Sequence, residues 1–171
     1  MSSQLVYRLG CTLLLAFACV GVHAADLPQS VTVRYDDPQH FTETRRSSMI
    51  NRSEAEAWRE PLKAYFAQRA ARILAPGQRL EIDVTDVDLA GEYEPWRSGS
   101  LRDVRIVKNI YPPRIDLSFK LYGADGSVLR EGERKLRDPA FFQRTPLNNQ
   151  DSLRYEKAMI DRWLRQGADQ L

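Results

Sequence analysis

The chain has 171 residues and carries 25 Lys and Arg against 23 Asp and Glu, a formal net charge of +2. This near-neutral balance argues against a dedicated nucleic-acid binder, whose binding domain is strongly basic. It also argues against attraction to a membrane surface through net charge. We therefore expect most charged side chains to pair with one another on a solvated surface.

Residues 1–24 have the pattern of an export signal. Arg8 supplies a positive start, Leu9–Val20 is an apolar run, and Val22–Ala24 offers small residues for cleavage before Ala25. The apolar run has about twelve residues, whereas a membrane-spanning helix needs roughly 20. No later stretch is long and apolar enough to span a membrane. We expect a cleaved signal and one soluble domain over residues 25–171, located in the periplasm or secreted.

A lipoprotein acylated at Cys19 is the alternative interpretation of the same segment. It is less favoured because Phe17 is bulky and neither Leu nor Val stands three residues before Cys19.

Cleavage after Ala24 would change the chemistry that the chain can perform. It removes Cys11, Cys19, His23 and Arg8, which leaves His40 as the remaining histidine and a net charge of +1, from 24 bases and 23 acids. A Cys/His metal site and a cysteine nucleophile are thereby excluded for the mature chain. We expect no cofactor.

The first half of the chain predicts a strand, a connection and a helix. Val31, Val33 and Tyr35 alternate with polar residues, which is typical of a half-buried strand. The segment 41–51 has no clear period, and we interpret it as an irregular connection. A capping-box pattern at Ser53–Glu56 then precedes an apolar helical stripe. The stripe contains Trp58, Leu62, Tyr65, Phe66, Ala70, Ile73 and Leu74, with Pro61 either kinking a first turn or starting the main helix.

The second half predicts four strands and a final helix. Apolar residues alternate from Leu80 to Val84 and continue at Val87 and Leu89, a change of phase that predicts a β-bulge at Thr85–Asp86. Further strands are expected over 103–110, 115–121 and 128–136, the last two joined by a tight turn at Gly123–Gly126. A short helix is expected near Asp138–Phe142, and a longer one from Asp151 with Leu153, Ile160, Trp163 and Leu164 on its apolar side.

This order of elements predicts an α+β fold in a single two-layer domain. We expect an antiparallel meander sheet of about five strands, with two main helices on one face, because consecutive strands are joined by short turns.

The segment Thr85–Trp96 has an unusual density of carboxylates, which is consistent with three interpretations. Asp86, Asp88 and Glu92 could hold a divalent cation, although an EF-hand fails at Ala90 and Arg97. Glu92 and Glu94, beside Tyr93 and Trp96, could serve a small hydrolase as acid and base. The third interpretation is pairing between six acids in 81–94 and five bases in 97–114 on neighbouring strands. We favour this pairing, and we predict no metal site.

The segment Tyr111–Arg114 contains two prolines and is expected to form an extended corner between strands. We expect Tyr111 and the prolines to pack against Trp96, rather than to dock into an aromatic groove of a partner. The candidate binding residues of the chain are Asp86, Asp88, Glu92, Glu94, Trp96, Tyr111 and Arg114.

Three blocks of the sequence carry a resemblance to a known family. They are PGQRLEIDVTDVDLAGEYEPW, DVRIVKNIYPPRIDLSFKLYGADGSVLREGERKLRD and DSLRYEKAMIDRWL. Together they resemble the exported bacterial domain of unknown function numbered three thousand and sixteen, over roughly Val31–Leu164. The resemblance implies export to the bacterial envelope and one compact domain, and it assigns no site residues.

The sequence thus favours a non-catalytic protein that binds an envelope protein or a small ligand, with no nucleic acid as partner and no catalytic residues assigned. A carboxylate-based hydrolase is the alternative, and a divalent-cation-binding protein is the third hypothesis.

Overall fold

The main sheet of this protein has four strands and mixes parallel with antiparallel pairing. The computed structural model describes residues 28–47, 54–97, 102–145 and 148–171. In the sheet order β1-β2-β5-β6, β1 is parallel to β2, whereas the other two pairs are antiparallel. The strands are β1 (Val31–Tyr35), β2 (Arg79–Asp88), β5 (Arg114–Tyr122) and β6 (Val128–Arg137).

The predicted α+β class is confirmed, but the antiparallel meander of five strands is wrong. A parallel neighbour needs a long crossover, and the helical segment between β1 and β2 supplies one. The strand predicted over 103–110 is also wrong as part of this sheet. Its strand portion is β4 (Arg105–Ile106), which pairs with β3 (Glu92–Tyr93) in a separate two-stranded sheet. The position beside β2 is instead taken by β5, whose apolar residues alternate along the whole strand.

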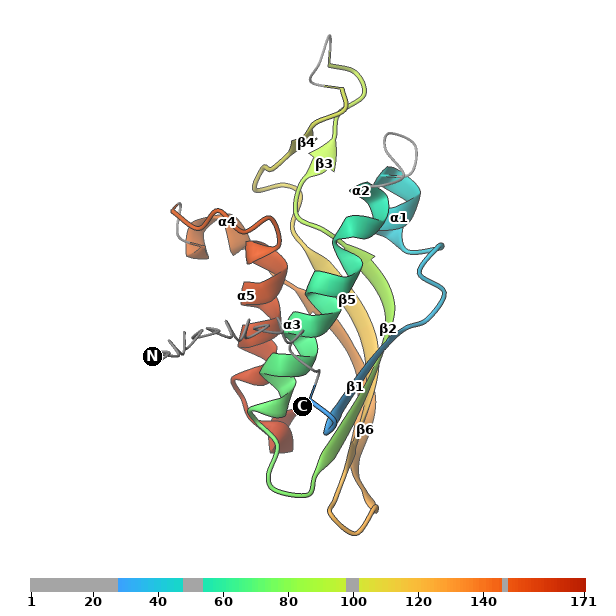
Figure 1. The fold of residues 1–171 in the computed structure, drawn as a ribbon. Coiled ribbons are helices and arrows are strands. Elements are labelled where there is room, and N and C mark those ends of the chain that lie inside the picture. The colour runs from blue at the N-terminus through green and yellow to red at the C-terminus, as the bar shows by residue number, and fades with distance from the viewer. Residues whose placement is uncertain (1–27, 48–53, 98–101, 146–147) are drawn as a thin grey trace, which may run out of the picture.

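Two helices cover one face of the main sheet, as predicted, and the core lies between the layers (Figure 1). They are α3 (Arg59–Ala71) and α5 (Arg154–Leu164). Trp163 of α5 contacts the ring edges of Phe66 and Phe119, with centroids 5.7 and 6.0 Å apart. The buried strand residues include Val31, Val33, Leu80, Ile82, Val84, Ile115, Leu117, Phe119 and Leu121.

The predicted β-bulge is confirmed, because the register of β2 against β5 shifts between Val84 and Asp86. The shift keeps Val87 in the core after Val84. It lies where β1 ends, since Tyr35 is the partner of Val84. The last residues of β2 therefore continue beyond β1.

A short helix replaces part of the irregular connection that we predicted over 41–51. This helix, α1 (Thr42–Ser47), contacts the part of β2 that extends beyond β1. The chain then continues through α2 (Glu54–Ala57) to α3, so that Pro61 falls in the first turn of α3, where its missing N–H costs little. Ser53 of the predicted capping box lies outside the described residues.

The C-terminal part agrees with the predicted helices, with later boundaries. They are α4 (Phe141–Arg144) and α5, and a 3-10 helix that was not predicted, η2 (Ala168–Gln170), follows them. Among the described residues, no helix is long and apolar enough to cross a membrane.

The chain between β2 and β5 forms an arm that projects past the end of the sheet (Figure 1). We use "the arm" for residues 91–111, of which 91–97 and 102–111 are described. The arm contains β3 and β4 and starts at Gly91, whose N–H donates to the carbonyl of Tyr111 at 3.0 Å. This bond closes the base of the arm.

Candidate functional site

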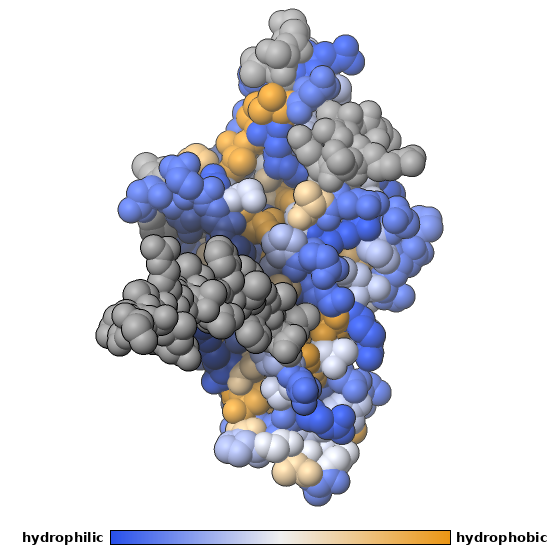
Figure 2. All heavy atoms as spheres, in the orientation of Figure 1, coloured by the Kyte–Doolittle hydropathy of each residue, from blue (hydrophilic) through white to orange (hydrophobic). Residues whose placement is uncertain are grey.

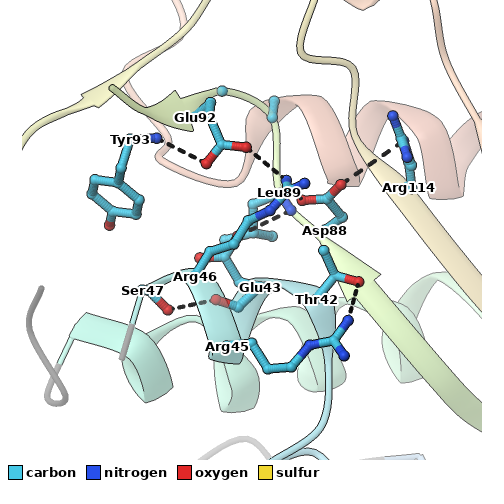
Figure 3. Close-up of polar contacts among 12 residues, drawn as sticks. Thr42, Glu43, Arg45, Arg46, Ser47, Asp88, Leu89, Glu92, Tyr93 and Arg114 are labelled. Carbon is cyan, nitrogen blue, oxygen red and sulfur yellow. Dashed lines mark hydrogen bonds and ion pairs between the residues drawn. The ribbon is translucent and has the colours of Figure 1, made fainter. Parts of the chain in front are cut away.

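The acidic end of β2 holds α1 in place. Asp86 accepts hydrogen bonds from the backbone N–H of Thr42 at 2.6 Å and from its hydroxyl at 2.8 Å. Asp88 accepts from Arg46 at 2.8 Å, and Arg46 also lies 2.9 Å from Glu92 of β3. Arg46 therefore joins β2, α1 and the arm, and Figure 3 shows it between the two carboxylates. These carboxylates therefore hold α1 against β2 and the arm.

Asp88 is nevertheless an unusual carboxylate, because it is buried. Burial raises its pKa above the ordinary value, and the positive charges of Arg46 and Arg114 only partly offset that effect. Arg114 lies 3.8 Å from the carboxylate and is half exposed (Figure 3). The cluster of Arg46, Asp88, Glu92 and Arg114 thus brings three of the predicted binding residues together.

A second carboxylate of α1, Glu43, is also buried and reaches into the base of the arm. One oxygen accepts from the backbone N–H of Leu89 at 3.2 Å, and the other from the guanidinium of Arg105. The Arg105 guanidinium lies 4.7 Å from the ring centroid of Tyr93. The ion pair between Glu43 and Arg105 therefore connects α1 with both strands of the arm.

A third buried carboxyl belongs to Glu156 in the first turn of α5. Its Oε1 accepts from the backbone N–H of Ala90 at 2.7 Å, whereas its Oε2 is buried with no hydrogen-bond partner. Burial raises the pKa of Glu156 to about 7; Arg105 acts against this shift and Glu43 adds to it. Glu156 thus carries a proton below about pH 7 and is ionised above it.

Glu94 organises the outer part of the arm. It accepts hydrogen bonds from Lys108, from Arg97 and, at 3.1 Å, from the Tyr111 hydroxyl. These donors, Lys108 first, lower the pKa of Glu94 to about 2. The carboxylate therefore stays ionised and joins both legs of the arm.

Trp96 lies two residues beyond Glu94 and is 72% exposed. The expected packing of Tyr111 and the prolines against Trp96 is therefore wrong, because Tyr111 binds Glu94 instead. Ile110 and Val104, on the returning leg of the arm, are 65% and 47% exposed. In Figure 2, hydrophobic residues appear on the arm within a largely hydrophilic surface.

A pocket of about 340 Å³ opens at the base of the arm. Its apolar lining comes from α2 and α3, from the end of β2 and from the start of α5. These residues are Ala57, Trp58, Pro61, Leu89, Ala90 and Leu153. The remaining lining is polar and includes Glu43, Tyr93, Arg105, Asp151 and Lys157. A cavity of this volume and lining is in the range of ligand sites in proteins.

The structure separates the predicted binding residues into distinct sets. Asp88 and Glu92 meet at Arg46, and Arg114 pairs with Asp88. Glu94 binds Tyr111, Asp86 binds Thr42, and Trp96 is exposed to solvent. The favoured pairing of 81–94 with 97–114 occurs for Glu94 with Arg97 and Lys108, and for Asp88 with Arg114. It fails for Arg105, whose partner is Glu43. The lining of the pocket includes none of the four predicted carboxylates.

Sequence reasoning missed Glu43, Arg46 and Glu156, and it gave Arg105 a different partner from Glu43. Glu156 gave a usable signal, because it stands three residues after Leu153 and four before Ile160, on the apolar stripe of its helix. Glu43 and Arg46 gave none, since their partners are distant in sequence. Within the described residues, no group of three or more His, Cys, Asp or Glu side chains could hold a metal ion.

The fold and site define a two-layer α+β protein with a projecting arm and a pocket at its base. A family model described as "Protein of unknown function (DUF3016)" matches residues 29–166, and the chain belongs to this family. This agrees with the resemblance found in the sequence. Comparisons with curated proteins and with solved structures gave no match.

Proposed function

We propose that this protein is a non-catalytic binding protein that contacts a partner protein through its arm. The observation that carries the proposal is the 72% exposure of Trp96 beside the Glu94 hydrogen-bond network. An indole in water gains free energy when a partner covers it, and Trp is among the residues that dominate binding energies at interfaces.

The position of Trp96 favours a role in binding over exposure without a function. Glu94 joins the two legs of the arm through Lys108 and Tyr111, so the chain next to Trp96 is held before any partner arrives. Little ordering is then required on binding, and pre-organisation of this kind favours affinity. Ile110 and Val104 add exposed apolar area on the same arm.

We further propose that the protein acts outside the cytoplasm, in the periplasm or after secretion, as one domain released from the signal at residues 1–24. The support is the sequence pattern of that segment.

The hydrolase alternative has less support from the geometry. Asp86, Asp88, Glu92 and Glu94 each engage partners within the protein, and none of them lines the pocket at the base of the arm. The cation hypothesis is weakened in the same way, because the same oxygens already accept from Thr42 and Arg46.

Photo-crosslinking in cells tests the proposal directly. A benzophenone amino acid would replace Trp96 or Ile110 in the full chain, with Gln68, an exposed residue of α3, as the control position. We expect a crosslinked product of one defined mass from positions 96 and 110 and none from position 68.

Trp96→Ala in the purified protein should abolish capture of the crosslinked partner without lowering the midpoint of thermal unfolding, since the side chain is exposed. The absence of any crosslink at positions 96 and 110, or equal crosslinking at position 68, would refute the proposal.

A further inference from the structure

The pocket at the base of the arm has a balanced set of charges. Of its lining residues, Arg105 is paired with Glu43, and Lys157 is paired with Asp151. The charged lining therefore sums to zero. A charged ligand group would have to break one of these pairs, and an ionised group that loses its partner in a partly buried site is costly.

The same two ion pairs keep spare hydrogen-bonding capacity. A lysine ammonium has three donors and a guanidinium has five, while each carboxylate accepts at several positions. The pocket can thus offer both donors and acceptors to an uncharged group. An amide, which has one N–H and one C=O, matches that pattern.

The pocket also has an apolar lining. It includes Trp58 and Pro61 at the start of α3, Leu89 just after β2 and Leu153 just before α5. Trp58 is fixed from behind, because its ring lies 6.4 Å from Phe41 and 5.9 Å from Tyr35, centroid to centroid. These aromatic contacts hold the Trp58 side of the pocket in place. A cavity of about 340 Å³ has room for a large side chain with its flanking backbone.

We propose that this pocket receives a large uncharged apolar side chain from an extended segment of the partner protein, whose flanking amides hydrogen-bond to the two ion pairs. The inference rests on the proposed function and names the chemistry of the partner. The arm favours a protein segment over a free small molecule, because Tyr93 and Arg105 of the arm line the pocket while Trp96 and Ile110 add exposed apolar surface on the same arm.

Figure 2 agrees with this arrangement. Hydrophobic residues appear on the arm and again in the hollow beneath it, between α2–α3 on one side and α4–α5 on the other. A segment that fills the pocket would pass directly beneath the arm, so that one partner chain can engage both features.

The experiment uses a neutral capped peptide, acetyl-Gly-Leu-Phe-Gly-amide, as the probe of the full chain. We expect a saturable titration in which the amide resonances of Leu89, Ala90 and Leu153 shift. The variant Ala57→Phe fills the pocket from an exposed position on α2 and should weaken binding at least tenfold. Gln68→Phe adds the same ring to an exposed position outside the lining and should leave the affinity unchanged.

Two further probes test which chemical class of ligand the pocket accepts. A peptide with Glu and Lys in place of Leu and Phe should not bind. The free amino acid leucine should also fail, because it lacks the flanking amides; tighter binding of leucine than of the capped peptide would assign the pocket to a small molecule and overturn the inference.

Partner capture separates this inference from the function on which it rests. Loss of capture in both Trp96→Ala and Ala57→Phe supports the two together. Loss in Trp96→Ala alone, with Ala57→Phe fully active, would sink the pocket inference and leave the proposed function standing.

Discussion

Buried carboxyl groups dominate this protein at the scale of single residues. Glu43, Asp88 and Glu156 lie within the fold, and their surroundings differ. Glu43 faces the guanidinium of Arg105, and Asp88 faces Arg46 and Arg114, whereas Glu156 has only a backbone N–H on one oxygen. Glu156 thus lacks a direct cationic partner, and burial raises its pKa to about 7.

Glu156 makes stability depend on pH in a direction opposite to that of a salt-bridged acid. Its pKa is about 7 in the folded protein against an ordinary 4.5, so the folded state keeps a proton that the unfolded state releases. The contribution of Glu156 to stability is therefore greatest below pH 4.5, falls as pH rises towards 7, and levels off above it.

The variant Glu156→Gln removes this dependence, since an amide does not ionise. Relative to wild type, it should gain on the order of 3 kcal/mol between pH 5 and pH 8. Urea unfolding at several pH values measures the difference, with Glu133→Gln on the exposed side of β6 as control. A difference between wild type and Glu156→Gln that stays constant from pH 5 to pH 8 would contradict the assignment.

The pKa of Glu94 is shifted downward, so its contribution to stability depends on pH in the direction opposite to that of Glu156. Its pKa is lowered to about 2 by Lys108, Arg97 and Tyr111, so its contribution is present above pH 4.5 and is lost as pH falls towards 2. Glu94→Gln should loosen the arm while the core stays intact. Hydrogen exchange is expected to quicken at Tyr93 and Ile106 and to be unchanged at Phe119. Equal protection of the arm in both proteins would show that Glu94 does not hold it.

At the scale of elements, the arm depends on a close backbone approach where it leaves β2. Gly91 has φ +94°, and a Cβ atom there would lie 3.0 Å from the Ile106 carbonyl oxygen and from Cγ of Arg105. Gly126, in the turn between β5 and β6, has φ +82° with open space around it. Both glycines have a positive φ, but only at Gly91 would an added Cβ atom meet neighbouring atoms.

Substituting each glycine by alanine separates these two effects. Gly126→Ala should cost roughly 1 kcal/mol, the price of a left-handed conformation for an L-residue. Gly91→Ala should cost more, about 2 to 4 kcal/mol, because strain and crowding both act there. Thermal or denaturant unfolding of the two variants provides the comparison, and equal costs would mean that the arm can move aside freely.

The elements also show how far sequence reasoning could reach. The bulge after Val84, the turn at Gly123–Gly126 and the stripes of α3 and α5 follow from local periodicity, and all were predicted. The parallel partner of β1 was missed, because nothing in VTVRY records which strand it joins. The same reason explains α1, whose stability comes from Asp86 and Asp88, more than 40 residues away.

For the candidate site, composition identified the carboxylates and Trp96 but could not assign their partners. Glu94 was expected to pair with nearby bases and does so with Lys108 and Arg97. Arg105 was expected to pair with an acid of residues 81–94, but it forms its ion pair with Glu43 of α1. Which partner wins depends on the distance between chain segments in the fold, and no local pattern encodes that distance.

At the scale of the whole molecule, the large apolar side chains of the core and those of the arm differ in exposure. Ile160, between the sheet and the helices, has no exposed area, whereas Ile110 on the arm is 65% exposed; Val128, Leu129 and Phe142 are also exposed, outside the arm. Because the arm projects beyond the sheet (Figure 1), its apolar residues contribute little to the core. Stability and binding should therefore respond to different substitutions.

One pair of identical changes tests that separation. Ile160→Ala removes buried methyl groups and should destabilise the protein by about 2 to 5 kcal/mol. Ile110→Ala should change stability by no more than about 0.5 kcal/mol, because the side chain is exposed, and should instead weaken capture of the crosslinked partner. Denaturant unfolding and partner capture would be measured on both variants. If Ile110→Ala destabilised the fold as much as Ile160→Ala, the arm would belong to the core and its apolar surface would need no partner to explain it.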